Sequence, residues 1–518
     1  MHSGAASRRS HYTVAHALRV LENHFSPAVP RAPKGNNIVC ASARGSYITD
    51  VSGKRYLDFQ NGIGVSNTGH SHPKVVAAIT KQIQDGIHLQ QNCMISQPTI
   101  ALCEKLLEVA PKGLSRFFFN CTYPRVALPT CPCVPCSMLR VQLSRKRSRA
   151  PRAWMPRSTS SSSSSSPTPK TITRLQQTPP PLRTNPPSPP SPCAGTGSEA
   201  VESAVKLARH ETGKQNVIVF NGGFHGRSLT TLAMTTSKGV YRVNYGPLPS
   251  GFHTSKYPYC LHCPSRPSAG GCCGDALETL RTMLKEQTAP SETAAIVIEP
   301  ILGEGGYTVP PPGFLPALRA LCDEHGILLI ADEVQSGVGR TGRWWGVEHE
   351  GVTPDILIFA KAIASGVPLS GIMARPHFMR KSPPGSMGGT YGATAIAASA
   401  AVATLGVIQE EGLLANAQAR GEQLQAGLQA IAARHPGVIA DVRGRGCMVG
   451  LEFSAAVRSG FAGAVTAEAM ERGLLLFTTG WRETIRLIPA LIVTQQECDT
   501  ALQVIEASIA AAAAGGGK

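Results

Sequence analysis

Four short apolar runs recur through the middle of the chain, at residues 217–220, 294–299, 327–331 and 356–360. Stretches with helical periodicity lie between them, and residues 316–324 are one example. Short runs without apolar–polar alternation are typical of strands buried on both faces, and parallel strands need helical crossovers. The pattern therefore predicts an α/β fold in which helices cover both faces of a mainly parallel central sheet.

The regions on either side of this core predict a second, smaller α+β part. Before the core, the sequence indicates short strands with a turn at Gly53 and Lys54, and two helices follow. After Gly388, long Ala-rich helices precede further strands. The predicted ranges are 35–57 for the first strands, 73–84, 96–109, 394–410 and 413–434 for the helices, and 448–453 and 485–488 for the last strands.

These elements suggest a division into domains. The N-terminal residues include Arg8, Arg9 and Arg19 and no acidic residue before Glu22, which fits either an ordinary arm or a mitochondrial transit peptide. We therefore expect a mitochondrial or a cytoplasmic protein. The predicted segments are an arm at 1–35, the N-terminal part of a small domain at 36–75, a large domain at 76–375, the C-terminal part of the small domain at 376–510 and a frayed tail at 511–518.

The stretch at 121–195 interrupts the large domain and carries much of the net charge of +17. It contains 11 basic and no acidic residues, 16 of the 40 prolines and a serine run at 160–166. Such a composition does not bury enough apolar surface to offset the entropy of ordering, so we interpret the stretch as a disordered insertion. Joining Asn120 to Thr196 gives an unbroken strand-to-helix turn, and our hypothesis is a translated intron or a gene-model error.

Cysteine usage and hydropathy narrow the protein class further. The 15 cysteines form an odd number in a chain without a clear secretory signal, which favours a reducing compartment. Cys260 and Cys263, followed by Cys272 and Cys273, are interpreted as loose thiols, and no metal site is expected. No apolar run approaches the roughly 18–20 residues of a membrane span, so we expect a soluble protein without a membrane partner.

Three of the apolar runs end in an ionisable residue, namely Glu299, Asp332 and Lys361. In open α/β sheets, ligands bind beyond the carboxyl ends of the strands. A charged residue at the end of a single strand shows only that the strand leaves the core for solvent. Three such strands with charges of both signs predict a functional site instead.

The residues around these strand ends resemble the class III pyridoxal-phosphate-dependent aminotransferases, and 4-aminobutyrate aminotransferases in particular. The resemblance runs from about residue 36 to 510, except across 121–195. It implies the fold of the type I pyridoxal-phosphate enzymes and pyridoxal 5'-phosphate as the cofactor. The motifs that carry it lie at 197–200, 223–227, 298–306, 331–342, 359–361 and 388–391.

The resemblance assigns catalytic roles to two residues. Lys361 would bind the cofactor aldehyde covalently and afterwards move a proton, and burial at a strand end lowers the pKa of such an amine. Asp332 would pair with the pyridine nitrogen. The other cofactor-binding residues that the motifs imply are Gly197 and Ser198 for the phosphate, Phe224 and Val334 for the ring faces, Gln335 for the ring hydroxyl, and His225 and Glu299.

Further roles concern the phosphate, the partner subunit and the substrate. A helix that begins with Gly-Ser offers N–H groups to an anion, and Thr196 with Glu199 fits a capping box. Thr390 resembles the threonine that reaches the phosphate from the partner subunit, so a homodimer is implied. Substrate contacts are implied for Arg486, which would hold an α-carboxylate, for Glu304, which would mask Arg486, and for Arg227 and Ile63.

The sequence thus predicts a ping-pong transaminase that moves an amino group from a 4-aminobutyrate-like ω-amino acid to an α-keto acid. Alanine–glyoxylate, acetylornithine and ornithine aminotransferases remain alternatives within the family. An inactive relative with a nucleic-acid-binding insertion is an alternative of another class. We expect small-molecule substrates and no nucleic-acid partner.

Overall fold

The structure is a computed structural model that describes residues 13–15, 19, 38–91, 93–120, 197–263 and 274–515. Most of the expected N-terminal arm, the whole insertion at 121–195, Thr196, Cys272 and Cys273 lie outside the described residues. All described residues fall within one of the two compact units into which the chain divides. The domain boundaries drawn from the sequence remain predictions.

A central sheet of seven strands has the order β4-β10-β9-β8-β7-β5-β6. Strands β9, β8, β7, β5 and β6 are parallel, whereas β10 is antiparallel to both β9 and β4. The expected mainly parallel α/β sheet is confirmed. Strands β6 and β10 were not expected, because one is short and largely polar and the other contains a glycine. The bounds are β4 (Arg116–Asn120), β5 (Asn216–Phe220), β6 (Phe252–Ser255), β7 (Thr293–Ile298), β8 (Leu328–Asp332), β9 (Ile356–Phe359) and β10 (Ser370–Ala374).

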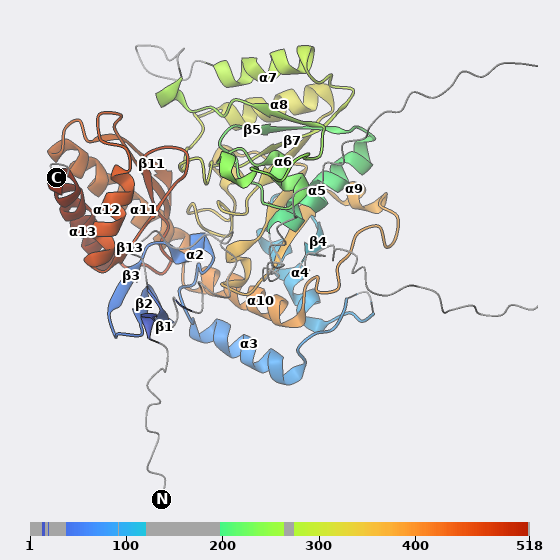
Figure 1. Ribbon diagram of the computed structural model, residues 1–518. Coiled ribbons are helices and arrows are strands. Elements are labelled where there is room, and N and C mark those ends of the chain that lie inside the picture. The colour runs from blue at the N-terminus through green and yellow to red at the C-terminus, as the bar shows by residue number, and fades with distance from the viewer. Residues whose placement is uncertain are drawn as a thin grey trace, which may run out of the picture. The chain divides into compact units, whose positions relative to one another are not determined.

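Alternate side chains of the parallel strands are buried on opposite faces of this sheet. Val217 and Val297 pack with helix α5 on one face, whereas Ile218 and Ile296 pack with α7 and α8 on the other. Figure 1 shows α7 and α8 on the opposite side of β5 and β7 from α5. Burial on both faces explains why these strands lack apolar–polar alternation. The helices are α5 (Gly197–Thr212), α6 (Leu229–Met234), α7 (Asp275–Glu286) and α8 (Phe314–His325).

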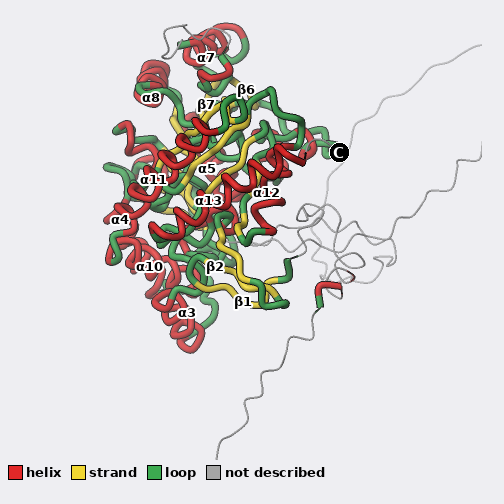
Figure 2. Tube along the Cα trace, turned by 90° about the vertical axis from the view of Figure 1, so that its left-hand side faces the viewer, coloured by secondary structure: helices red, strands yellow, loops and turns green. Residues whose placement is uncertain are grey.

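Segments from both ends of the chain build the smaller α+β part. Strand β3 pairs in parallel with β13 in the sheet β1-β2-β3-β13, so the N-terminal and C-terminal segments share one sheet. Figures 1 and 2 show β1 and β2 at the end of the structure opposite α7 and α8. The strands are β1 (Cys40–Arg44), β2 (Tyr47–Asp50), β3 (Arg55–Asp58) and β13 (Leu474–Leu475).

A second C-terminal sheet, with the order β11-β12-β15-β14, is antiparallel throughout and packs against α11 and α12, and α13 packs against these two helices. Helix α10 instead packs against α3 and α4 beside the central sheet. The bounds are α3 (Pro73–Asp85), α4 (Gln97–Val109), α9 (Pro376–Arg380), α10 (Ala395–Glu410), α11 (Leu413–Arg434), β11 (Ile439–Arg445), β12 (Met448–Phe453), α12 (Phe461–Glu471), β14 (Phe477–Thr478), β15 (Thr484–Leu487) and α13 (Gln495–Ala514).

The end of α13 corrects one prediction. The expected frayed tail at 511–518 is wrong for residues 511–514, which continue the helix to Ala514. Alanine has the highest helix propensity, and Ala512 is buried, so this turn is stabilised both locally and by packing. None of the helices in the described ranges combines the length and hydropathy of a bilayer span.

Candidate active site

The three charged strand ends meet at one edge of the central sheet. Asp332 is the last residue of β8, and Glu299 and Lys361 lie just beyond the ends of β7 and β9. The ladder registers pair Ile298 with Ala331 and Asp332 with Ile358. Because these strands are parallel neighbours, their carboxyl ends bring the carboxylates and the lysine together, as the sequence predicts.

A buried histidine holds Asp332. The Nδ1 atom of His225 lies 2.7 Å from Oδ2 of Asp332, and Oδ1 accepts a hydrogen bond from the Val334 N–H at 3.1 Å. Burial acts to lower the pKa of His225, but the hydrogen bond to Asp332 and the charges of Asp332 and Glu299 outweigh it and raise that pKa. The contact with His225 and the hydrogen bond from Val334 therefore hold the Asp332 carboxylate in a fixed orientation.

Glu299 and Gln335 share a tight pocket next to this pair. The carboxylate of Glu299 accepts hydrogen bonds from the Phe224 and Gly303 N–H groups, each at 2.9 Å. Burial raises the pKa of Glu299 to about 7. A Cβ atom at Gly303 would lie 2.9 Å from both Gln335 Nε2 and Glu299 Oε2, so only glycine fits there. Among the described residues, Oε1 of Gln335 is buried without a hydrogen-bond partner.

Lys361 occupies a strained position at the start of a short 3₁₀ helix, Lys361–Ala364. Its φ of 48° lies in the left-handed region, which costs energy for a residue with a Cβ and is concentrated at functional sites. Burial lowers the pKa of Lys361, and the carboxylates of Glu304 and Asp332 oppose that change. A lowered pKa increases the fraction of neutral amine, which is the nucleophilic form.

The N-terminus of α5 lies beside these residues. A Cβ atom at Gly197 would lie 3.0 Å from Val334 Cγ1, and one at Gly226 would lie 2.1 Å from Ser198 Oγ. Ser198 Oγ accepts a hydrogen bond from the Arg227 N–H at 3.3 Å. The predicted phosphate residues thus begin a helix whose free N–H groups suit an anion. The predicted cap, Thr196, lies outside the described residues.

Thr390 and Ile63 lie on loops. Thr390 is exposed on the segment that leads to α10, next to Gly392, whose Cβ would lie 2.8 Å from the Phe119 carbonyl oxygen. Ile63 belongs to the turn labelled α2 (Asn61–Gly64), in which all four residues have positive φ angles. A φ of 66° is unusual for a β-branched residue. This strained turn lies against Ile488, two residues beyond Arg486.

Arg486 and Glu304 form a buried ion pair, with Nη1 donating to Oε1. Their exposed fractions are 4% and 8%. Burial acts to raise the pKa of Glu304, but Arg486 and two lysines, Lys361 and Lys238, lower it below its usual value. Burial acts to lower the pKa of Arg486, and the charge of Glu304 raises it. The pair therefore places an arginine in the site with its charge neutralised.

Arg443 holds the loop that carries Glu304, and it did not stand out in the sequence. Its Nε donates to the Gly306 carbonyl oxygen at 2.9 Å, and its Nη2 lies 2.8 Å from the buried carboxylate of Glu452. Tyr259 donates to the same carboxylate at 2.7 Å and lies under the Arg443 guanidinium. A single arginine on a strand gives no local signal, because its partners come from other elements.

Two cations without an ion-pair partner among the described residues, Arg227 and Lys238, flank the ring of Tyr241. Only Arg227 was predicted from the sequence. Arg227 Cζ lies 5.3 Å and Lys238 Nζ 5.9 Å from the centre of that ring. Phe224, predicted to stack on the cofactor, packs edge-on against Tyr241 at 5.7 Å. Burial and the charge of Glu304 raise the pKa of Tyr241, and the charges of Arg227 and Arg486 oppose that change.

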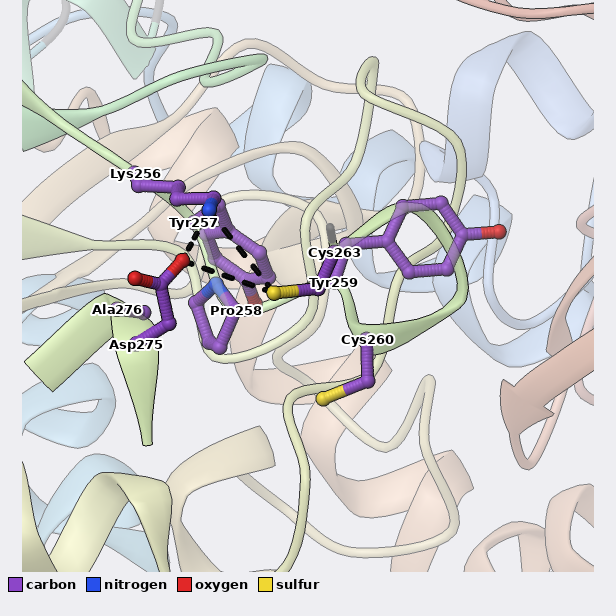
Figure 3. A pocket seen from close by; sticks show the side chains of 8 residues that line it. All are labelled: Lys256, Tyr257, Pro258, Tyr259, Cys260, Cys263, Asp275 and Ala276. Atoms are coloured by element: carbon purple, nitrogen blue, oxygen red, sulfur yellow. Dashed lines mark hydrogen bonds and ion pairs between the residues drawn. The ribbon is translucent and has the colours of Figure 1, made fainter. Parts of the chain in front are cut away.

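The cysteine pair lies in a separate small pocket (Figure 3). Cys263 Sγ lies 3.9 Å from Lys256 Nζ and 3.6 Å from Asp275 Oδ2, whereas the side chain of Cys260 points away from both. Within the described ranges, no three His, Cys, Asp or Glu side chains cluster as metal ligands do.

The residues at the sheet edge fit pyridoxal phosphate. The unpartnered Oε1 of Gln335 suits the hydroxyl of a ring, and the glycines at 197, 226 and 303 permit the close packing of Val334, Ser198 and Gln335 in the site. Asp332 supplies the anion for a protonated ring nitrogen, and Lys361 supplies the amine for the aldehyde. Together these groups match the donors and acceptors around the cofactor.

The family model for "Aminotransferase class-III" matches residues 30–122 and 185–509. The unmatched residues between these two parts fall within the insertion predicted at 121–195. The family match therefore continues on both sides of that stretch, as the sequence motifs do.

Two relatives agree with this family match. The chain is 35% identical to "5-aminovalerate aminotransferase DavT" of Pseudomonas putida, over 94% of this chain and 97% of that one. It is also 35% identical to "4-aminobutyrate aminotransferase GabT" of Escherichia coli, over 93% of this chain and 95% of that one.

Solved structures share the fold over nearly the whole chain. A PLP-bound amine transaminase from an uncultivated Pseudomonas species is 27% identical with a TM-score of 0.73, and covers 94% of this chain and 98% of its own. The ornithine aminotransferase of Toxoplasma gondii is 25% identical with a TM-score of 0.74, and covers 98% and 97%. The chain therefore belongs to the class III aminotransferases and is a pyridoxal 5'-phosphate-dependent enzyme.

Proposed function

We propose that this enzyme moves the amino group of an ω-amino acid, such as 4-aminobutyrate or 5-aminovalerate, to an α-keto acid by a ping-pong mechanism. The buried Arg486–Glu304 pair is the observation that carries the proposal. The names of the two relatives at 35% identity support the same class of donor.

The ion pair selects between two kinds of substrate. While Glu304 neutralises Arg486, that arginine is not available to an α-carboxylate. The site then suits an amine on a carbon that bears no carboxylate. The carboxylate of an ω-amino acid lies at its other end, for which Arg227, without an ion-pair partner in the described part of the chain, offers a positive charge. When an α-keto acid enters, Glu304 must move aside so that Arg486 can bind the α-carboxylate with two parallel hydrogen bonds.

The remaining residues act on the reacting end of the substrate. The bound cofactor supplies an electron sink for the carbanion. The amine of Lys361 would act as the general base that takes the proton from the substrate carbon. Asp332, held by His225, stabilises the positive charge on the ring nitrogen while this happens.

A donor panel on the purified holoenzyme tests the proposal. With 2-oxoglutarate as acceptor, we expect turnover with 4-aminobutyrate and 5-aminovalerate to exceed that with ornithine, acetylornithine or alanine. Ornithine and acetylornithine belong in the panel because relatives that act on them are 32% identical. A preference for ornithine or for acetylornithine would instead indicate the corresponding aminotransferase activity. A protein without turnover that binds nucleic acid would instead indicate an inactive relative.

Lys361→Ala provides the matched control. Loss of the amine should remove the visible absorbance of the lysine-bound cofactor and reduce turnover at least about a hundredfold, as expected for loss of a general base. A variant that kept both the colour and the turnover would contradict the role of Lys361.

A homodimer is part of the proposal. Apolar side chains are exposed around the connection between α3 and α4, with Ile95 80% and Ile87 64% exposed, and Thr390 is exposed as well. A second copy would cover such a patch and bring its own Thr390 to the phosphate. Sedimentation of the holoenzyme should give the mass of a dimer, and a monomer that is fully active would contradict this.

A further inference from the structure

One row of residues crosses three strands of the second C-terminal sheet and ends at the arginine of the buried ion pair. Arg443 on β11 pairs with Gly450 on β12, and Gly450 pairs with Arg486 on β15. Residues directly opposite one another on neighbouring strands share a face of the sheet. The two arginines therefore lie on the same face, with a glycine between them.

The loop at 299–306 rests on this glycine. A Cβ atom built on Gly450 would lie 3.0 Å from the Gly306 carbonyl oxygen and 3.2 Å from Tyr307 Cβ. Tyr307 has a φ of 55°, which costs energy for a residue with a Cβ unless the surrounding structure holds it. A larger residue at 450 would push this strained backbone away from the sheet.

The two arginines hold the loop in different ways. Arg486 binds a side chain, the carboxylate of Glu304, which rotates about its own bonds. Arg443 binds the backbone instead, and its Nε donates to the Gly306 carbonyl oxygen at 2.9 Å. Rotation of the Glu304 side chain therefore breaks the first contact and leaves the second one in place.

Arg443 is itself fixed by partners outside the loop. Its Nη1 lies 2.9 Å from Asp441 Oδ2, its Nη2 lies 2.8 Å from Glu452 Oε2, and its Cζ lies 4.9 Å from the centre of the Tyr259 ring. The residue is only 8% exposed. Two acids thus orient the guanidinium, and its Nε points to the loop.

We propose that Arg443 is a positioning residue that sets how readily Arg486 exchanges partners. By fixing the loop backbone, it lets Glu304 reach Arg486 through rotation of its side chain alone. Fewer torsions must then be ordered to close the ion pair, so the entropic cost of closing it is smaller. The inference rests on the proposed function, because it concerns the exchange of substrates at the same ion pair.

Arg443→Gln tests the proposal through the two substrates. The measured quantity is the ratio of the KM for 4-aminobutyrate to the KM for 2-oxoglutarate in the holoenzyme. A weaker ion pair raises the first KM and lowers the second, because Arg486 is then free more often. Loss of one hydrogen bond to the loop should raise the ratio about fivefold, with little change in kcat.

Gly450→Ala disturbs the same contact and keeps every charge. The new Cβ crowds the Gly306 carbonyl oxygen, so the ratio should rise as in Arg443→Gln. This variant also decides the question if Arg443→Gln does not fold, since Glu452 would be buried without its arginine. Asp441→Asn is the matched control, because it removes an ion pair of Arg443 and keeps the contact with the loop. It should leave the ratio unchanged.

A double-mutant cycle with Glu304→Ala separates positioning from a general structural role. Without the Glu304 carboxylate, the loop has no group to present to Arg486. Arg443→Gln and Gly450→Ala should therefore leave the ratio of Glu304→Ala unchanged, whereas independent effects would multiply. Melting curves measure how much of each variant is folded.

Three results would overturn the inference. The first is an unchanged ratio in the folded Arg443→Gln or Gly450→Ala variant. The second is a change in Asp441→Asn as large as in Arg443→Gln, and the third is a cycle in which the effects multiply. Failure of the proposed function would look different. An enzyme inactive with ω-amino donors and active with alanine would contradict that function, and the same cycle on the KM for 2-oxoglutarate would still test Arg443.

Discussion

The two ends of the candidate active site are built in different ways. The ring end, defined as Asp332, His225, Glu299 and Gln335, comes from neighbouring parallel strands and the turns that follow them. The carboxylate end, defined as Arg486, Glu304, Arg443 and Gly306, joins the central region to an antiparallel C-terminal sheet. The loop at 299–306 contributes one glutamate to each end.

The difference lies in how the buried carboxylates are compensated. At the ring end, Glu299 accepts hydrogen bonds from backbone N–H groups, which do not move with a substrate. At the carboxylate end, the partner of Glu304 is the side chain of Arg486 rather than the backbone, and in the proposed function a substrate carboxylate takes the place of Glu304 on this arginine. We infer that the ring end is preorganised for one cofactor, whereas the carboxylate end exchanges partners between the two half-reactions.

Asp332→Asn changes the ring end and should have the largest effect on activity. The amide keeps the shape and an acceptor for His225 but removes the negative charge that stabilises a protonated ring nitrogen. We expect kcat/KM to fall by about 10²–10³-fold with every donor. Steady-state kinetics at saturating cofactor measures this, and the visible absorbance band should show that the cofactor still binds.

Asp355→Asn is the control for removing a buried aspartate. Asp355 precedes β9 at the opposite edge of the sheet and pairs with Arg319 at 2.8 Å. This change should lower the melting temperature and leave kcat/KM of the folded enzyme unchanged. Equal losses of kcat/KM in both variants would remove the special role assigned to Asp332.

Gly303→Ala should have the next largest effect, and it should weaken the binding of the cofactor. The added Cβ would lie 2.9 Å from both Gln335 Nε2 and Glu299 Oε2, and burial restricts the shift of either group. We expect about a tenfold weaker affinity for pyridoxal phosphate, equivalent to roughly 1.4 kcal/mol. Fluorescence titration of the apoenzyme measures it. Unchanged affinity would show that the ring end is more adaptable than its geometry indicates.

The same two ends differ in how far the sequence predicts them. Asp332, Glu299 and Lys361 each follow an apolar strand, so local pattern and the strand-end rule place them together without a structure. The resemblance added roles for Gln335 and Arg486. The contact between His225 and Asp332 spans more than a hundred residues, and no periodicity marks it.

Long-range partners explain what the sequence left out. Arg443 acquires its position from Gly306 and Glu452, which lie on separate elements. The same holds for β10, whose antiparallel place between β9 and β4 depends on the whole sheet. Side chains that act through tertiary contacts carry no signal in a single sequence.

Glu304→Gln should affect the carboxylate end. We expect it to change the KM values of two substrates in opposite directions. With Arg486 no longer neutralised, an α-carboxylate finds a free cation, so KM for 2-oxoglutarate should fall severalfold. An ω-amino donor gains nothing from that charge, and its KM should rise by up to about tenfold. Single-turnover measurements of each half-reaction separate the two effects, and a parallel change in both would contradict the exchange of partners.

Glu333→Gln should give the smallest effect. We expect it to change the pH dependence of stability rather than the reaction rate. Glu333 follows Asp332, is buried and accepts a hydrogen bond from the Val347 N–H at 2.9 Å. Burial raises its pKa from 4.5 to about 7. Between those values the folded state binds more protons than the unfolded state, so stability decreases as pH rises.

The expected slope from Glu333 is about 1 kcal/mol per pH unit between roughly pH 4.5 and 7. Glu333→Gln removes it, so the variant should melt about 2 °C or more above the wild type at pH 8 and close to it at pH 5. Glu304→Gln should not change this slope, because Arg486 lowers the pKa of Glu304 and its titration falls below that range. Glu299, whose pKa is also raised, should account for the slope that remains in Glu333→Gln. Identical slopes in the wild type and Glu333→Gln would mean that Glu333 does not titrate with a raised pKa. The contrast between acids held by backbone N–H groups near the ring and the acid paired with an arginine near the substrate carboxylate would then depend on Glu299 alone.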